Sequence, residues 1–215
     1  MNLHACVGCE ISMPFSWNLK NLPFCQTCFT YLKPHTEFNS EFYAVYPSHG
    51  VSHKILRHWK KHPHSLFETE IFRRARPALE KLKSCHRKES WDYLIPIPQK
   101  SSRAFLLGGG PARRIAERLA RELNIPVADA LENRSSDGSS QAKKSLQERF
   151  ESPLEFGVTT HHGYEFFNKR ALLVDDFMTS GQTLKQAKLA LVRAGLDDVS
   201  IFVLGHRPHF FNRDV

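Results

Sequence analysis

The sequence lacks several features that would place it in other classes of protein. None of its 215 residues lies in an apolar run of the roughly 18 residues that a membrane-spanning helix needs. The first ten residues, MNLHACVGCE, do not contain the charged segment and apolar stretch of a secretory signal. No internal repeat is present. We therefore expect a cytoplasmic protein without a transmembrane segment.

Acidic residues are too few to balance the basic ones. The chain has 22 Asp and Glu against 30 Lys and Arg, which gives a formal net charge of +8. This excess favours polyanionic partners such as phosphates or nucleic acid. With 41% hydrophobic and 11% aromatic residues, the composition excludes a disordered chain and suits one good core with a small additional domain.

Cysteine is scarce, yet four of the five cysteines form two Cys-x-x-Cys pairs separated by 15 residues. In a reducing compartment this spacing is typical of a zinc ribbon or knuckle. Four thiolates fill all positions of a tetrahedral shell, so the Zn²⁺ would be structural. A segment this small cannot form a sufficient hydrophobic core and needs a metal site of this kind to fold. Four unmetallated thiols are the weaker interpretation. We predict a four-cysteine zinc-binding head over residues 1–45, with Cys6, Cys9, Cys25 and Cys28 as ligands.

Aromatic residues are frequent in this head. They suit either stacking on nucleic-acid bases or packing of a very small domain. At least half of them are expected to pack. The residues are Phe15, Trp17, Phe24, Phe29 and Tyr31.

Two amphipathic helices are predicted between the head and the remainder of the chain, over residues 46–90. Apolar residues recur at helical spacing from Val51 to Trp59 and again from Ser65 to Lys88. Their basic side chains suit contact with the phosphates of single-stranded DNA. A solvated helix face is the alternative interpretation of the same charges. The nucleic-acid candidates on this basic helical bridge are Lys54, Arg57, Lys60, Arg73, Arg74 and Arg76.

Short apolar strands alternate with helices over residues 91–215. Strands are predicted within Trp91–Pro98, over Arg170–Val174 and over Val199–Leu204, and helices from Pro111 and over Thr183–Ala194. Such alternation predicts an α/β domain with a doubly wound parallel sheet.

The segment after the strand at Arg170–Val174 carries the most informative chemistry. Asp175 and Asp176 follow the strand, where ligands of parallel sheets bind. The next residues, Thr-Ser-Gly-Gln-Thr, lead into a helix whose first N–H groups can hold an anion. Two acids beside a phosphate make sense if they hold sugar hydroxyls or Mg²⁺, so a ribose 5-phosphate fits. An ordinary capped loop is the alternative.

The full pattern resembles the signature for 5-phosphoribosyl 1-diphosphate (PRPP) in type I phosphoribosyltransferases: four apolar residues, two acids, two apolar residues, then Thr-Ser-Gly-x-Thr. Phe177 is bulkier than the usual residue of this motif. The resemblance implies that Asp175 and Asp176 act as the catalytic acids on the ribose of Mg²⁺-bound PRPP. It also implies a PRPP-binding set made of both acids with Thr179, Ser180, Gly181, Gln182 and Thr183.

Together with the cysteine head, the chain resembles the competence-associated ComF/GntX family. This family usually has Arg-Gly-Phe-Asn-Gln after the first strand, where this chain has Leu-Gly-Gly-Gly-Pro at residues 107–111. The change leaves a nearby basic loop as the candidate for binding diphosphate, with a solvated loop as the equal alternative. Its residues are Lys100, Ser101, Ser102 and Arg103.

The resemblance implies a type I phosphoribosyltransferase-like fold and a protein that binds PRPP with Mg²⁺. It further implies a part in the uptake of single-stranded DNA during natural transformation, beside a competence helicase at the cytoplasmic face of the membrane. The alternative is a phosphoribosyltransferase enzyme that acts on a nucleobase or another small nitrogen acceptor. The sequence has no recognisable set of residues that would bind an acceptor base.

Overall fold

The computed structural model describes residues 3–14, 24–35, 37–62, 65–99, 110–133, 156–159 and 165–207. The chain divides into two compact units. The first unit comprises Met1–Lys88, Asp176–Thr179 and Val203–Val215, and the second comprises Glu89–Asp175 and Ser180–Phe202. Two long strands, β8 (Arg170–Met178) and β9 (Asp198–His206), contribute residues to both units.

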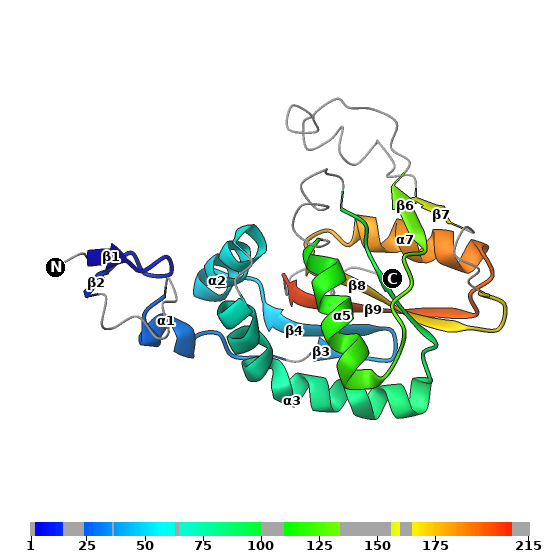
Figure 1. The fold of residues 1–215 in the computed structure, drawn as a ribbon, viewed down its shortest axis with the longest axis horizontal. Helices are drawn as coiled ribbons and strands as arrows, with labels where there is room; N and C mark the ends of the chain where they lie inside the picture. The colour runs from blue at the N-terminus through cyan, green and yellow to red at the C-terminus, as the bar shows by residue number, and fades with distance from the viewer. Residues whose placement is uncertain are drawn as a thin grey trace. The chain divides into compact units, whose positions relative to one another are not determined.

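The first unit begins with a small antiparallel ribbon of β1 (Leu3–Ala5) and β2 (Ser12–Pro14), followed by the short helix α1 (Gln26–Thr30). A second antiparallel pair follows, formed by β3 (Glu37–Phe38) and β4 (Phe42–Pro47). Helices α2 (Gly50–Lys61) and α3 (Ser65–Glu89) then confirm the two predicted helices (Figure 1).

Aromatic side chains form the core of the first unit. Phe24 stacks on Phe67 of α3 with 5.3 Å between ring centroids, and Phe29 meets Phe67 edge-on at 6.0 Å. Both Phe24 and Phe29 are fully buried, and burial of one such ring contributes about 1.5–3 kcal/mol. Tyr46 of β4 donates its hydroxyl hydrogen to the carbonyl of Ile71 at 2.7 Å, and burial raises the pKa of this phenol. The cysteine segment therefore packs onto α3 instead of relying on its thiols alone.

The second unit contains β5 (Tyr93–Pro96), which lies parallel to β8 with Tyr93 opposite Ala171. Helices α5 (Pro111–Leu123) and α7 (Gln182–Arg193) present buried apolar stripes, since Ile115, Leu119 and Leu191 are fully buried. A separate antiparallel pair joins β6 (Leu131–Asn133) to β7 (Phe156–Val158).

The main sheet has the strand order β3-β4-β9-β8-β5. The predicted α/β fold with parallel strands is confirmed, and β5, β8 and β9 correspond to the three predicted strands. Strand β4 was not predicted, because five consecutive residues from Phe42 to Tyr46 are buried and show no alternation of apolar and polar side chains. In the part of the chain that the structure describes, no helix is long and apolar enough to cross a membrane.

Candidate functional site

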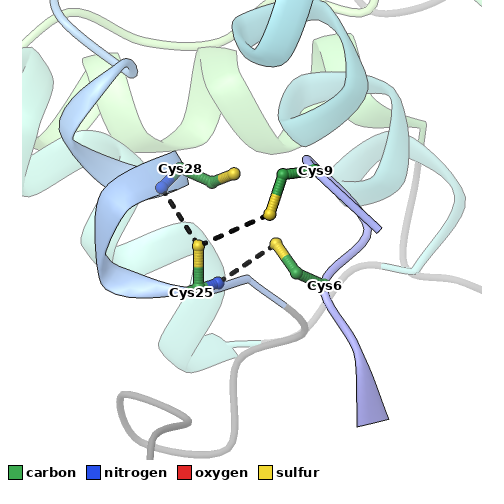
Figure 2. A group of neighbouring side chains, drawn as sticks. All are labelled: Cys6, Cys9, Cys25 and Cys28. Carbon is green, nitrogen blue, oxygen red and sulfur yellow. Dashed lines mark hydrogen bonds between the residues drawn. The ribbon is translucent and has the colours of Figure 1, made fainter. Parts of the chain in front are cut away.

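The two Cys-x-x-Cys pairs come together in space. One pair lies in the turn between β1 and β2, and the other lies at the start of α1. All four sulfur atoms, from Cys6, Cys9, Cys25 and Cys28, lie within 4.8 Å of one another (Figure 2). The Cys9 and Cys25 sulfurs are 3.8 Å apart, which matches the edge of about 3.8 Å that Zn–S bonds of about 2.3 Å give a tetrahedron. The cluster therefore suits an ion with tetrahedral coordination, such as Zn²⁺, whose four ligands would all be cysteine sulfurs.

The backbone around the cluster is arranged to hold thiolates. The N–H of Cys25 donates to the Cys6 sulfur, and the N–H of Cys28 donates to the Cys25 sulfur, both at 3.3 Å. Burial raises the pKa of Cys6, but the N–H groups of Cys25, Cys9 and Gly8 outweigh it and lower this pKa to about 6. Gly8 is required here because a Cβ would lie 2.7 Å from the Cys28 sulfur.

Lys54 of α2 contacts the same head. Its Nζ donates to the carbonyl of Gly8 at 3.2 Å and pairs with Glu10 at 3.1 Å. Four thiolates around a divalent ion carry a net charge of about −2, so a cation beside Gly8 complements the cluster. The structure thus places this nucleic-acid candidate at the cysteine head.

The other basic candidates of α2 and α3 do not form one unpaired stripe. Arg73 and Arg74 both pair with Glu70, at 2.6 and 3.0 Å, and the hydrogen bond from Arg73 is the main cause that lowers the pKa of Glu70. Arg57 and Arg76 are exposed. The side chain of Arg73 is 63% exposed, and surface ion pairs are worth about 0–1 kcal/mol, so Arg73 can exchange Glu70 for a phosphate. Arg74 is half-buried and lies 4.8 Å from the ring centroid of Phe29, so it is held in the core.

Strand β8 delivers the acids of the predicted PRPP loop. Asp175 is half-buried, whereas Asp176 has only 4% of its surface exposed. Successive side chains of a strand point to opposite faces, so the two carboxylates do not form a side-by-side pair. This arrangement gives the two acids different surroundings, which the sequence did not predict.

The loop after β8 has the geometry of an anion cradle. Thr179 and Ser180 are exposed, and Gly181 adopts a left-handed conformation with φ of 72°. Helix α7 begins at the next residue, and Gly181 as its N-cap has no side chain with which to occupy the first N–H groups. The hydroxyl of Ser180 lies 3.5 Å from the N–H of Gln182, at the limit of a hydrogen bond. The first N–H groups of α7 can therefore serve an external acceptor.

Asp176 has a partner from far along the chain. Lys60 of α2 places its Nζ 2.8 Å from Oδ2 and 3.1 Å from Oδ1 of this carboxylate. The same ammonium lies 5.8 Å from the ring centroid of Phe177. The sequence suggested Lys60 only as a nucleic-acid candidate.

The predicted diphosphate loop, Lys100, Ser101, Ser102 and Arg103, lies outside the described residues. So do the Leu-Gly-Gly part of the altered segment at residues 107–109 and two of the head aromatics, at positions 15 and 17. Gly110 precedes α5 as its N-cap, and Arg113 in the first turn pairs with Glu117 at 2.9 Å and with Asp129.

Three comparisons with known proteins bear on these sites. Residues 109–210 match the family described as "Phosphoribosyl transferase domain", a span that includes β8, the acid loop, α7 and β9. Competence protein F of Haemophilus influenzae is 22% identical over 218 residues, covering 94% of this chain and 93% of that protein.

Among solved structures, adenine phosphoribosyltransferase from Leishmania tarentolae aligns with a TM-score of 0.43 and 16% identity, over 80% of this chain and 94% of that chain. A purine phosphoribosyltransferase from Pyrococcus horikoshii aligns with a TM-score of 0.40 and 18% identity, over 66% and 78% of the two chains.

Proposed function

We propose that this homologue of Competence protein F, with its phosphoribosyl transferase domain, binds PRPP or a related phosphoribosyl ligand together with Mg²⁺ at the loop between β8 and α7. The observation that carries the proposal is the geometry of this loop. A strand that carries two acids near its carboxyl end leads through the left-handed Gly181 into the start of α7. Acids for a sugar and N–H groups for a phosphate therefore lie on one short segment.

Each part of the loop has a distinct task in this proposal. The hydroxyls of Thr179, Ser180 and Thr183 and the first N–H groups of α7 hold the 5-phosphate, which the helix dipole also favours. The half-buried Asp175 accepts hydrogen bonds from ribose hydroxyls and offers oxygen ligands for Mg²⁺. Bound Mg²⁺ would neutralise charge on the diphosphate. Lys100 and Arg103 are proposed to neutralise the remainder.

The head has a structural role in this proposal. Cys6, Cys9, Cys25 and Cys28 hold one Zn²⁺ in this proposal, which the clustering of their sulfurs within 4.8 Å of one another supports. All four positions of that shell are taken by sulfur, so the ion has no open site for catalysis. Metal binding then adds to the stability that the head gains from packing Phe24 and Phe29 against α3.

We also propose that the chain handles incoming single-stranded DNA in the cytoplasm, beside a competence helicase at the membrane face. The name of the Haemophilus relative and the net charge of +8 support this role. Tyr31 of the head is 62% exposed and suits stacking on a base, whereas Phe24 and Phe29 are fully buried in the core. Arg57, Arg73 and Arg76 are exposed and would supply the cations.

Transfer of the phosphoribosyl group to a nucleobase is the second candidate, and the domain match supports it. In that reaction the bond from the ribose C1 to the diphosphate breaks, and a bond to an acceptor nitrogen forms. A screen for diphosphate release with PRPP and nucleobases separates the two candidates. Base-dependent release would favour the enzyme, and ligand binding without release would favour the binding protein.

Isothermal titration calorimetry with PRPP and Mg²⁺ tests the central proposal. We expect saturable binding to the wild type and a loss of about tenfold or more in Asp175→Asn, which removes a charged acceptor. Asp197→Asn is the matched control, because Asp197 is an exposed acid between α7 and β9. Binding that is equal in the wild type and Asp175→Asn, or absent from the wild type, would contradict the proposal.

A further inference from the structure

We infer that Lys60 is a positioning residue of the phosphoribosyl site. From α2 it fixes the carboxylate of Asp176 and thereby the end of β8, from which the phosphate loop starts. Its effect on a ligand rests on the proposed function, whereas its effect on the loop does not. The structure pairs Lys60 with Asp176, so Lys60 acts on a ligand through another residue.

The burial of Asp176 shows why it needs this partner. Its side chain is 6% exposed, and both of its oxygens lie within 3.1 Å of the Lys60 ammonium. A carboxylate withdrawn this far from water is costly unless a cation or hydrogen-bond donors compensate it. Removing the cation takes this compensation away from the buried carboxylate, and a movement of Asp176 toward water would displace the end of β8.

The helix beneath Lys60 is firmly held. Ile55, Leu56 and Trp59 of α2 are all fully buried. Trp59 also donates its indole N–H to Glu68 of α3 at 3.2 Å. Lys60 therefore projects from a fixed base, and the ion pair transmits that position to Asp176.

The neighbouring residue is held by the same helix. The ring of Phe177 lies 6.2 Å from the ring of His53 and beneath the Lys60 ammonium. A Cβ at Gly205 of β9 would lie 2.7 Å from the Phe177 ring and 3.2 Å from Leu56. The unusually large residue of the motif is thus accommodated by a glycine on β9. Residues 176 and 177 are fixed by packing and charge just before Thr179 begins the loop.

This arrangement separates the roles of the two acids. The strand turns Asp175 and Asp176 to opposite faces, and only Asp176 is nearly inaccessible. Asp176 therefore anchors the loop through Lys60, and Asp175 serves the ligand. The resemblance in sequence assigned both acids to the ribose and did not distinguish them.

Three variants of the full chain test this inference. Lys60→Met removes the charge, Lys60→Arg restores a cation, and Lys61→Met changes the adjacent exposed lysine. The first readout is hydrogen–deuterium exchange of residues 176–181 without ligand. We expect faster exchange in Lys60→Met, and exchange like that of the wild type in Lys60→Arg and Lys61→Met. Equal exchange in all four proteins would overturn the inference, whatever the ligand is.

The second readout is calorimetric titration with PRPP and Mg²⁺. We expect Lys60→Met to weaken binding about tenfold, since small misplacement of a binding group has effects of this size or larger. Lys60→Arg should recover most of the affinity. The inference would be overturned if Lys60→Arg bound PRPP as weakly as Lys60→Met. It would also be overturned if Lys60→Met bound PRPP with the affinity of the wild type. A wild type that ignores PRPP contradicts the proposed function alone, because the exchange data still decide the role of Lys60.

Discussion

The cysteine cluster and the β8–α7 loop are built in different ways. Each Cys-x-x-Cys pair forms within a single turn, and the two turns meet across 15 intervening residues of the chain. The loop also has a local motif, but the partner of its buried acid lies 116 positions away on α2. A short motif can therefore identify a ligand class while leaving open which of its residues faces the ligand.

The largest expected effect is at the cysteine cluster. Cys28→Ser should abolish binding of Zn²⁺, because structural zinc contributes an apparent free energy of about 10–16 kcal/mol that is shared with folding. Elemental analysis and near-ultraviolet circular dichroism of the buried head aromatics measure the loss.

Cys85→Ser is the matched control, since this half-buried cysteine of α3 lies outside the cluster. It should retain about one zinc per chain by the four-ligand rule. Equal zinc in the two variants, or a zinc-free wild type with a folded head, would show that the cluster does not depend on metal.

A smaller effect is expected where β9 accommodates Phe177. Gly205→Ala would place a methyl group 2.7 Å from the aromatic ring, and overpacking of this kind costs about 1–3 kcal/mol. Urea unfolding measures the free energy. Adding Phe177→Leu should recover part of the loss, because the smaller side chain leaves room for the methyl group. If the single and double variants lose the same stability, this long-range contact does not support the loop.

The smallest effect is expected at exposed basic residues. Arg57→Gln with Arg76→Gln should weaken binding to a labelled single-stranded oligonucleotide and lower the salt slope by roughly 0.7 for each phosphate that is no longer neutralised. Fluorescence anisotropy at several salt concentrations measures both. Lys61→Gln is the comparison for a nearby exposed cation. A wild type without measurable affinity at low salt would remove the proposed DNA role.

Local patterns predicted much of the fold. The periodicity of apolar residues predicted α2, α3, α5 and α7 to within a few residues, and the apolar runs predicted β5, β8 and β9. The hairpin of β3 and β4 was missed, although Asn39 supplies a turn signal by accepting from the N–H groups of Glu41 and Phe42 at 2.9 and 2.7 Å.

Long-range pairing limited the prediction of the site. The four cysteines could be chosen from spacing alone, because each Cys-x-x-Cys turn fixes two ligands. Lys60 could not be assigned to Asp176, since nothing in either local sequence encodes a contact between α2 and β8. The close packing of the Phe177 ring against Gly205 could not be predicted for the same reason.

The most direct measurement is hydrogen–deuterium exchange of the wild-type protein with and without PRPP and Mg²⁺. We expect slower exchange in the peptides that contain Asp175 to Lys185, because the ligand would bind the end of β8 and the start of α7. Residues 24–35 of the cysteine head should show no change. Protection confined to the head, or no protection of the loop at saturating PRPP, would contradict the assignment of the loop as the phosphoribosyl site.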